Sequence, residues 1–185
     1  MLVCKFNLSV NFTVFCLWKV KKLHNFMWRY FSNSFSSRSL CVPMALSVFS
    51  HYNFLHLSLN MYVVWSFTSV SVDNFLDLTR FFISALFDQT FWALFLTAGL
   101  VSSLFGIAHK AVLKSPIRAV GASGAILGLL AYTCMKIPDA RLKIVLIPNF
   151  DFSARTAIVG ILLFDLAGLL LRQIVCCCCC VIYIM

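Results

Sequence analysis

The chain has 185 residues, of which 62% are hydrophobic and only 11% are charged. A soluble domain of this length has too much surface for its volume to bury so many apolar side chains, whereas a lipid bilayer accepts them. The net charge of +9 comes from Lys and Arg residues that lie mostly in short clusters between apolar runs, as in loops beside a membrane surface. We therefore expect a polytopic membrane protein. Because no soluble domain carries a basic stripe, we do not expect it to bind nucleic acid.

Five apolar runs approach the length that a helix needs to cross a bilayer. They cover residues 2–18, 54–72, 90–108, 119–135 and 156–171. A shorter apolar piece at 78–88 is too brief to span and predicts an interfacial helix or a loop insertion. The sequence thus predicts an all-α bundle of about five transmembrane helices over residues 1–171, followed by a divergent, cysteine-rich apolar tail at 172–185.

The basic residues do not fix the orientation of this bundle. The loops on one face, which follow the first and third runs, carry about eight of them, and the opposite face carries about six. The positive charges of the first run, Lys19, Lys21 and Lys22, follow it rather than precede it, which is the reverse of a secretory signal peptide. An Arg- and Ser-rich mitochondrial presequence is also absent from the first residues, so no targeting segment is identified.

The second run opens with HYNFLHLSLNM and places polar side chains inside an apolar segment. His56 and Asn60 are four residues apart, so they lie on one face of a helix, one turn above the other. Two neutral hydrogen-bond donors in this arrangement are able to hold a developing negative oxygen. The alternative is that they form interhelical hydrogen bonds that only hold the bundle together.

The fourth run, AVGASGAILGLLAYTCM, holds Ser123 between Gly121 and Gly124. Gly124 and Gly128 form a GxxxG pair, a spacing typical of two helices in close contact. In that interpretation Ser123 is one more small residue of a seam, and without a further span the seam would face lipid. In the second interpretation, the glycines clear space around the hydroxyl of Ser123. They also leave the backbone N–H of Ser123 free near a helix start, where anions bind.

The order of these motifs, HxxxN on one span and GxSG two spans later, resembles the rhomboid family of intramembrane serine proteases. The stretches SVFSHYNFLHLSLNMYVVWSF, GASGAILG, MKIPDARL and DLAG are similar to its mitochondrial, presenilins-associated rhomboid-like branch. The resemblance runs from about Phe15 to Leu171, and the segment 78–88 looks like an insertion. It implies a catalytic core of six spans in which a serine attacks a peptide bond within or beside the membrane.

By that resemblance Ser123 is the nucleophile. Its backbone N–H would form an oxyanion hole with the side chains of His56 and Asn60, and Gly121 and Gly124 would give space around the nucleophile. Removing one such donor typically costs about a hundred- to a thousandfold in rate.

Two further features match the family less directly. His51 matches a histidine often found before this motif, and we assign it to loop structure rather than to chemistry. Trp28–Arg29 resembles a Trp-Arg pair of the family, although its spacing to His51 is longer here.

A serine hydroxyl needs an adjacent base to accept its proton, and the family uses a histidine on the sixth span. The histidines of this chain all lie upstream of Ser123, and the family likeness stops after Leu171. The general-base histidine is therefore absent from the 185 residues, and we expect that they show no measurable cleavage of a transmembrane substrate.

Three other side chains fit the role of base poorly. His109 ends the third run and is interpreted as an ordinary loop histidine. Asp165 lies in the fifth run among apolar neighbours, and we interpret it as a hydrogen-bonding anchor. Lys136 lies about 20 Å from Ser123 if both are on one helix that rises about 1.5 Å per residue.

The nine cysteines predict no disulfide framework and no metal site, since they are scattered singly or, from Cys176 to Cys180, directly adjacent. The adjacent block has three interpretations. It is palmitoylated near the membrane, it binds metal despite side chains that point in too many directions, or it is a low-complexity stretch that replaces the true last segment. We favour the last, and we expect neither a metal nor a cofactor.

Three functional hypotheses follow. The first is an intramembrane serine endopeptidase, of which this chain is an incomplete or alternatively ended copy. The second is a catalytically dead rhomboid-like protein that binds transmembrane clients without cutting them. The third is a membrane scaffold or transporter-like bundle in which the Gly–Ser seam is only packing. The first two imply transmembrane segments of other proteins as partners, and the branch resemblance implies the mitochondrial inner membrane.

Overall fold

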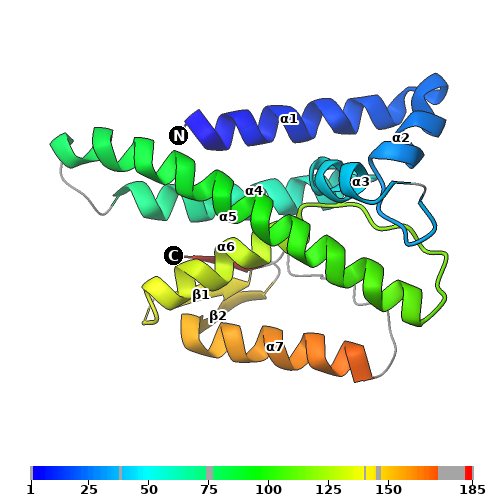
Figure 1. Cartoon of the computed structure of the whole chain (residues 1–185). Helices are drawn as coiled ribbons and strands as arrows, with labels where there is room; N and C mark the ends of the chain where they lie inside the picture. The colour runs from blue at the N-terminus through cyan, green and yellow to red at the C-terminus, as the bar shows by residue number, and fades with distance from the viewer. Residues whose placement is uncertain are drawn as a thin grey trace.

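The structure is a computed structural model that describes residues 2–37, 39–73, 77–139, 141–144, 147–170 and 182–184. Within these ranges the chain forms α-helices, two 3-10 turns and short strands (Figure 1). Their order is α1 (Leu2–Lys19), η1 (Lys21–Leu23), α2 (His24–Tyr30), α3 (Cys41–Leu46), η2 (Ser47–Phe49), α4 (Phe54–Asp73), α5 (Asp77–Val112), α6 (Ser123–Lys136), β1 (Arg141–Ile144), β2 (Ile147–Ser153), α7 (Ala154–Leu170) and β3 (Ile182–Ile184).

Four of the predicted apolar runs, at 2–18, 54–72, 119–135 and 156–171, form helices with bounds close to those expected. Side-chain caps explain where two of them begin. The backbone N–H of His56 donates to Oδ1 of Asn53 across 2.7 Å at the start of α4, and the N–H of Thr156 donates to Oγ of Ser153 across 3.2 Å at the start of α7. Such caps satisfy N–H groups that have no partner within the helix.

The third run belongs to a longer helix than predicted. The expectation of a separate interfacial helix or loop at 78–88 is wrong for the backbone, because α5 runs unbroken from Asp77 to Val112. That this segment is an insertion relative to the family stays a prediction. No glycine occurs in this helix before Gly99 and it contains no proline, so nothing in the sequence interrupts its hydrogen bonding. The structure does not describe the side chains of residues 78–88.

The expectation of an all-α fold omitted a small sheet. The strands lie in the order β2-β1-β3 and both pairings are antiparallel. β1 and β2 fill the connection between α6 and α7, while β3 comes from the predicted tail. The block Cys176 to Cys180 lies outside the described residues, so its three interpretations stay open.

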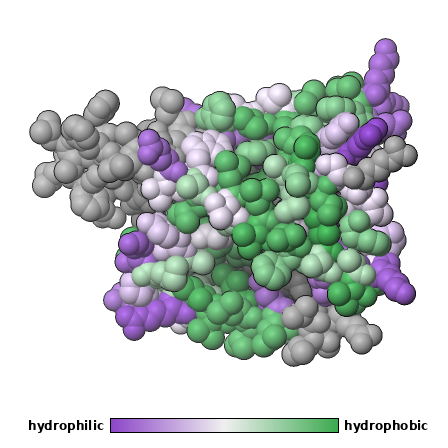
Figure 2. All heavy atoms as spheres, in the orientation of Figure 1, coloured by the Kyte–Doolittle hydropathy of each residue, from purple (hydrophilic) through white to green (hydrophobic). Residues whose placement is uncertain are grey.

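Among the described residues, one helical segment, Gln89–Val112 of α5, is long and apolar enough to cross a membrane by length and composition. The count of about five transmembrane helices stays a prediction. Hydrophobic side chains cover the middle of the face seen in Figure 2, and hydrophilic ones gather toward its two ends.

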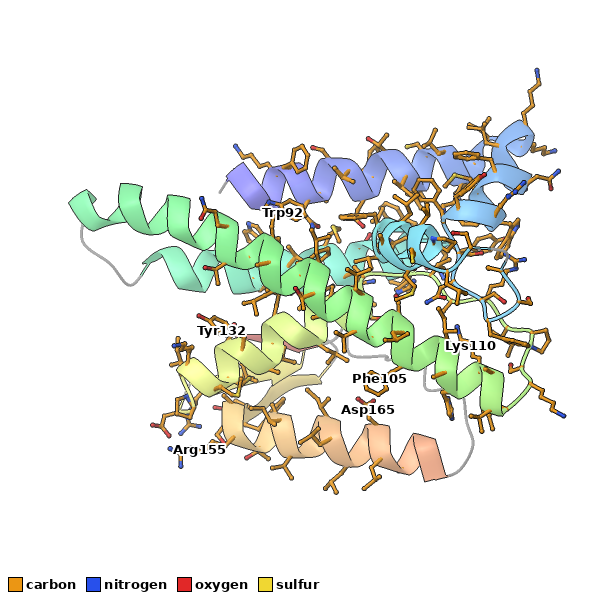
Figure 3. All side chains as sticks on the ribbon, in the orientation of Figure 1. Trp92, Phe105, Lys110, Tyr132, Arg155 and Asp165 are labelled. Carbon is orange, nitrogen blue, oxygen red and sulfur yellow. The ribbon has the colours of Figure 1, made fainter. Side chains whose placement is uncertain are left out.

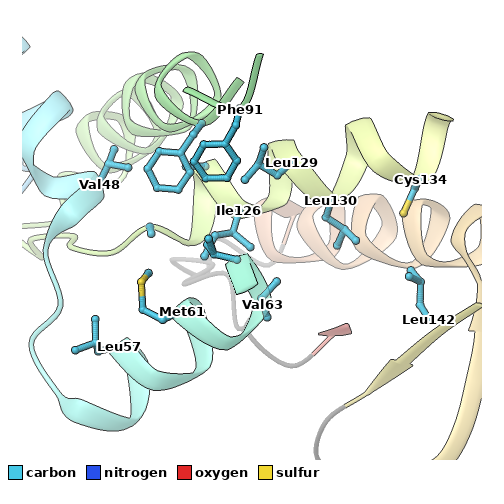
Figure 4. Packing of buried hydrophobic residues seen from close by; sticks show 14 of the residues in the cluster. Val48, Leu57, Met61, Val63, Phe91, Ile126, Leu129, Leu130, Cys134 and Leu142 are labelled. Atoms are coloured by element: carbon cyan, nitrogen blue, oxygen red, sulfur yellow. The ribbon is translucent and has the colours of Figure 1, made fainter. Parts of the chain in front are cut away.

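The hydrophobic core forms where α4, α5 and α6 meet. Phe91 and Phe95 of α5 stack with 5.5 Å between their ring centroids. Ile126 and Leu130 of α6 belong to the same buried cluster, which α4 completes (Figure 4). Helix α6 therefore lies inside the molecule, between α5 and α7 (Figure 1).

The glycine seam of α6 faces α5. A Cβ added at Gly124 would overlap the side chain of Ser102, and a Cβ added at Gly128 would overlap Cβ of Ala98. Small residues four apart on both helices let the two backbones approach closely. The expectation that this seam would face lipid is therefore wrong, because α5 fills the space beside it.

Candidate active site

Ser123 is the first residue of α6 and its side chain is partly buried. Its backbone N–H belongs to the first turn, whose N–H groups have no carbonyl partner within the helix. The positive end of the helix dipole also lies here. A negative oxygen placed beside this turn would therefore be stabilised.

The segment before Ser123 is held by the connection between α1 and α4. Ala119 and Asn33 exchange backbone hydrogen bonds of 2.8 and 2.9 Å, and the N–H of Gly121 donates to the carbonyl of Ser47 across 3.0 Å. These bonds keep 119–121 extended, which is why α6 begins four residues later than the predicted run at 119–135.

Gly121 brings the two sequence motifs together. Its φ of +130° lies in a region that side-chain-bearing residues rarely adopt. A Cβ at this position would lie 2.7 Å from Cε1 of His56 and 3.1 Å from its Nε2. The imidazole of His56 thus packs against the glycine that stands two residues before Ser123.

The side chain of Asn60 makes a hydrogen bond with His51. Its Nδ2 donates to Nε2 of His51 across 2.9 Å, and both side chains are completely buried. The rings of His51 and His56 meet edge to face, with 5.0 Å between their centroids. The three polar side chains on this part of the chain therefore form one cluster beside Gly121.

The cluster requires His51 to be neutral, because Nε2 must accept a hydrogen bond from the amide of Asn60. The pKa of His51 is lowered to about 3, mainly by burial and in smaller part by the neighbouring His56. The backbone of Phe49 acts in the opposite direction and raises this pKa, while Nδ1 of His51 makes no hydrogen bond with the described residues. His51 is therefore a fixed hydrogen-bond acceptor over the physiological pH range.

The structure places the predicted site residues in two groups. His56 lies against Gly121 at the start of α6, where Ser123 also stands, and Asn60 is linked to His56 through His51. Gly124 points instead to α5, and Ser102 occupies the space beside it. The catalytic roles assigned to these residues stay predictions.

The other candidates lie on separate elements. His109 is in the last turn of α5, Lys136 ends α6 at the end opposite Ser123, and Asp165 lies on α7 (Figure 3). Within the described ranges, no group of three or more His, Cys, Asp or Glu side chains is placed to hold a metal ion.

Two contacts were not predicted from the sequence: the contact of His51 within this cluster, and the contacts of Arg118 that support it. We assigned His51 to loop structure, although its place five residues before His56 is compatible with a contact to the HxxxN face. Arg118 donates to the backbone carbonyl of Trp28 and, across 3.1 Å, to Oγ of Ser32. A basic residue directly before an apolar run was the available signal, but its partner lies 90 residues away and only the fold reveals it.

Comparisons with known proteins agree with the motifs. Residues 26–176 match the Rhomboid domain. Over 164 residues the chain is 41% identical to Presenilin-associated rhomboid-like protein, mitochondrial, of Rattus norvegicus, and 40% identical to the protein of that name of Homo sapiens. It is 28% identical over 167 residues to Rhomboid protein 1, mitochondrial, of Saccharomyces cerevisiae.

Each of these matches covers 89% of the chain but only 40 to 45% of the relative. The chain thus spans less than half the length of the curated relatives it matches. No solved structure matches it. The extent of the domain match shows that the chain belongs to the rhomboid family, whose domain is embedded in membranes.

Proposed function

We propose that this chain carries the nucleophile and the oxyanion hole of a rhomboid-type intramembrane serine endopeptidase. Its substrates would be membrane proteins cut within or beside a transmembrane segment. The observation that supports this most directly is the contact between the imidazole of His56 and Gly121, two residues before Ser123. It joins HxxxN to GxSG at the start of α6, where a helix N-terminus favours negative charge.

In the proposed reaction, Oγ of Ser123 attacks the carbonyl carbon of the scissile peptide bond. The carbonyl oxygen becomes an oxyanion, which the backbone N–H of Ser123 and the side chains of His56 and Asn60 would stabilise. Collapse of this intermediate breaks the C–N bond, and the amine leaves with a proton while the acyl group stays on Ser123. Water then hydrolyses the ester. Each lost donor would slow the reaction about a hundred- to a thousandfold.

The serine proton needs an acceptor, and the described part of the chain shows no base in contact with Ser123. All its histidines precede Ser123, His51 holds Asn60, and His56 belongs to the proposed oxyanion hole. Loss of the base typically lowers the turnover of a serine protease by about a millionfold. We therefore propose that the 185 residues alone bind transmembrane clients but do not cleave them, which makes a client-binding, non-cleaving protein the second candidate function.

The decisive experiment supplies the base. Residues from 172 onward are replaced by the sixth span of a rhomboid protease that carries its histidine, and the chimera is reconstituted with a transmembrane reporter substrate. A chimera with the same span and its histidine changed to Ala is the matched control. We expect cleavage by the first chimera only, and its loss in Ser123→Ala.

The results separate the two candidates. A chimera that unfolds at the same temperature as its control but does not cut would contradict the protease proposal and favour client binding, which photo-crosslinking of the reporter then measures. Cleavage by the unmodified chain that Ser123→Ala abolishes would show that the chain contains its own base.

The relatives named mitochondrial support a location for this chain as well. We propose that it is a multi-pass protein of the mitochondrial inner membrane. Fractionation of mitochondria, followed by protease treatment of mitoplasts, tests this. Recovery in the outer-membrane fraction would contradict it.

A further inference from the structure

The charges of the chain are separated along its length. The chain has 15 basic and 6 acidic residues, yet no acidic residue occurs before Asp73, and none occurs between Asp88 and Asp139. Those two stretches contain the connection from α1 to α4 and the connection from α5 to α6. Both connections therefore carry positive charge that no acidic residue within them neutralises.

The two connections lie together at one end of the molecule, where α1 and α5 both end (Figure 1). The guanidinium of Arg118 donates to the carbonyl of Trp28 and to Ser32, and Ala119 pairs with Asn33. Six exposed basic residues share this end, which we name the basic end: Lys19, Lys21, Lys22, Arg29, Lys114 and Arg118.

The elements toward the opposite end carry basic and acidic residues in similar numbers: Lys5, Arg80, Lys136, Arg141, Lys143 and Arg155 against Asp73, Asp77, Asp88, Asp139 and Asp151. Helix α4 ends at Asp73 and α5 begins at Asp77. Beyond α6, Arg141 pairs with Asp151 at 2.8 Å and Arg155 lies 3.4 Å from Asp139. Figure 3 shows Arg155 and Lys110 far apart, near these two ends. The excess charge thus belongs to the basic end.

Aromatic side chains surround the charges of the basic end. The ring of Trp18 lies 5.0 Å from that of Trp28 and 5.8 Å from that of Tyr52, measured between centroids. Nζ of Lys19 lies 4.7 Å from the centroid of the Phe15 ring, and the guanidinium of Arg118 lies over Trp28 at 6.0 Å. Trp and Tyr beside exposed Lys and Arg are typical of the membrane–water interface.

We propose that the basic end binds the phosphate headgroups of anionic phospholipids. Its cations would contact the phosphates, while Trp28 and Tyr52, both exposed, would lie at headgroup level. Each Lys or Arg near an anionic membrane surface contributes about 1 kcal/mol. The charge would place this end at the more anionic leaflet, an orientation that counting basic residues alone does not give.

The test measures which lipid the protein prefers. The full chain is reconstituted in phosphatidylcholine vesicles that contain a small fraction of brominated phosphatidylglycerol or of brominated phosphatidylcholine, and quenching of tryptophan fluorescence gives a relative association constant. We expect a preference for phosphatidylglycerol that weakens in high salt, because exposed charges are screened.

Lys21→Gln/Lys22→Gln removes two exposed charges from the basic end, and Lys5→Gln/Lys136→Gln removes two exposed charges from elsewhere. We expect the first double variant to lower the preference by up to about fivefold per lysine, and the second to leave it unchanged. Equal losses in both, or no preference in the unsubstituted protein, would overturn the proposal. So would binding of a polyglutamate peptide that Lys21→Gln/Lys22→Gln abolishes while the lipid preference stays the same.

Discussion

The side-chain amide of Asn60 donates to Nε2 of His51 across 2.9 Å, and neither side chain is exposed. When neutral His51 carries its proton on Nδ1, Nε2 can only accept, so this bond fixes which way the carboxamide points. His51 stands before α4 and Asn60 stands within it, so the bond also fastens the helix to its incoming chain. Three predictions follow from this cluster and its supports, and a fourth follows from the seam between α5 and α6.

His51 should make the stability of the protein depend on pH. Its pKa is about 3 in the folded protein, against about 6.5 in an unfolded chain. Between these values the unfolded state takes up a proton that the folded state does not. The free energy of unfolding should therefore fall as the pH drops below about 6.5, by up to about 1.4 kcal/mol per pH unit.

The matched variant for this measurement is His51→Gln, which keeps an acceptor for Asn60 but does not titrate. Unfolding of both proteins in mixed micelles between pH 7.5 and 5 gives the two slopes. The slope of the variant should be smaller. Equal slopes would mean that other groups carry the pH dependence.

Gly121→Ala should destabilise the protein. The new Cβ would meet the His56 ring at 2.7 Å and the backbone would keep its φ of +130°. Strain of this kind costs about 1–3 kcal/mol. Thermal unfolding measures the loss. Gly160→Ala on α7 is the control, since nothing lies within 4 Å of its Cβ, and we expect no loss there. Similar melting temperatures for both variants would contradict the contact.

The seam between α5 and α6 should respond to exchanges of volume across it. Gly124→Ala would push its Cβ into the side chain of Ser102 and destabilise by about 1–3 kcal/mol. Adding Ser102→Gly removes the overlapping atoms and should restore most of the loss. A double-mutant cycle on the unfolding free energy measures this coupling. Additive effects would show that the two residues do not touch.

Arg118 should protect the segment that leads to Ser123. Arg118→Ala removes its bonds to Trp28 and Ser32, so hydrogen exchange at the amide of Ala119 should accelerate by about tenfold, which is about 1.4 kcal/mol. Arg118→Lys keeps the charge but not the geometry of the guanidinium, and should protect only partly. Unchanged exchange in Arg118→Ala would show that the Asn33–Ala119 bridge suffices.

Local pattern was enough to locate most of the helices. Helices such as α4 form because a mostly apolar segment of about twenty residues satisfies its backbone polar groups internally as a helix. Length alone misled at 78–88, where a segment too short to span is the first part of α5. The small sheet was missed because its strands are short, and β1 pairs with β3 about 40 residues further along the chain.

The sequence by itself determined the apolar class, the spacing of His56 and Asn60 on one helical face, and the family to which HxxxN and GxSG point. These features depend on composition or on short motifs that are each local in the sequence. Only the tertiary structure decided that His56 packs on Gly121, that Asn60 is held by His51, and that the glycine seam faces Ser102 and Ala98. Those contacts depend on how separate helices pack. The helical period predicts which residues share a face, but it does not predict which element packs against that face.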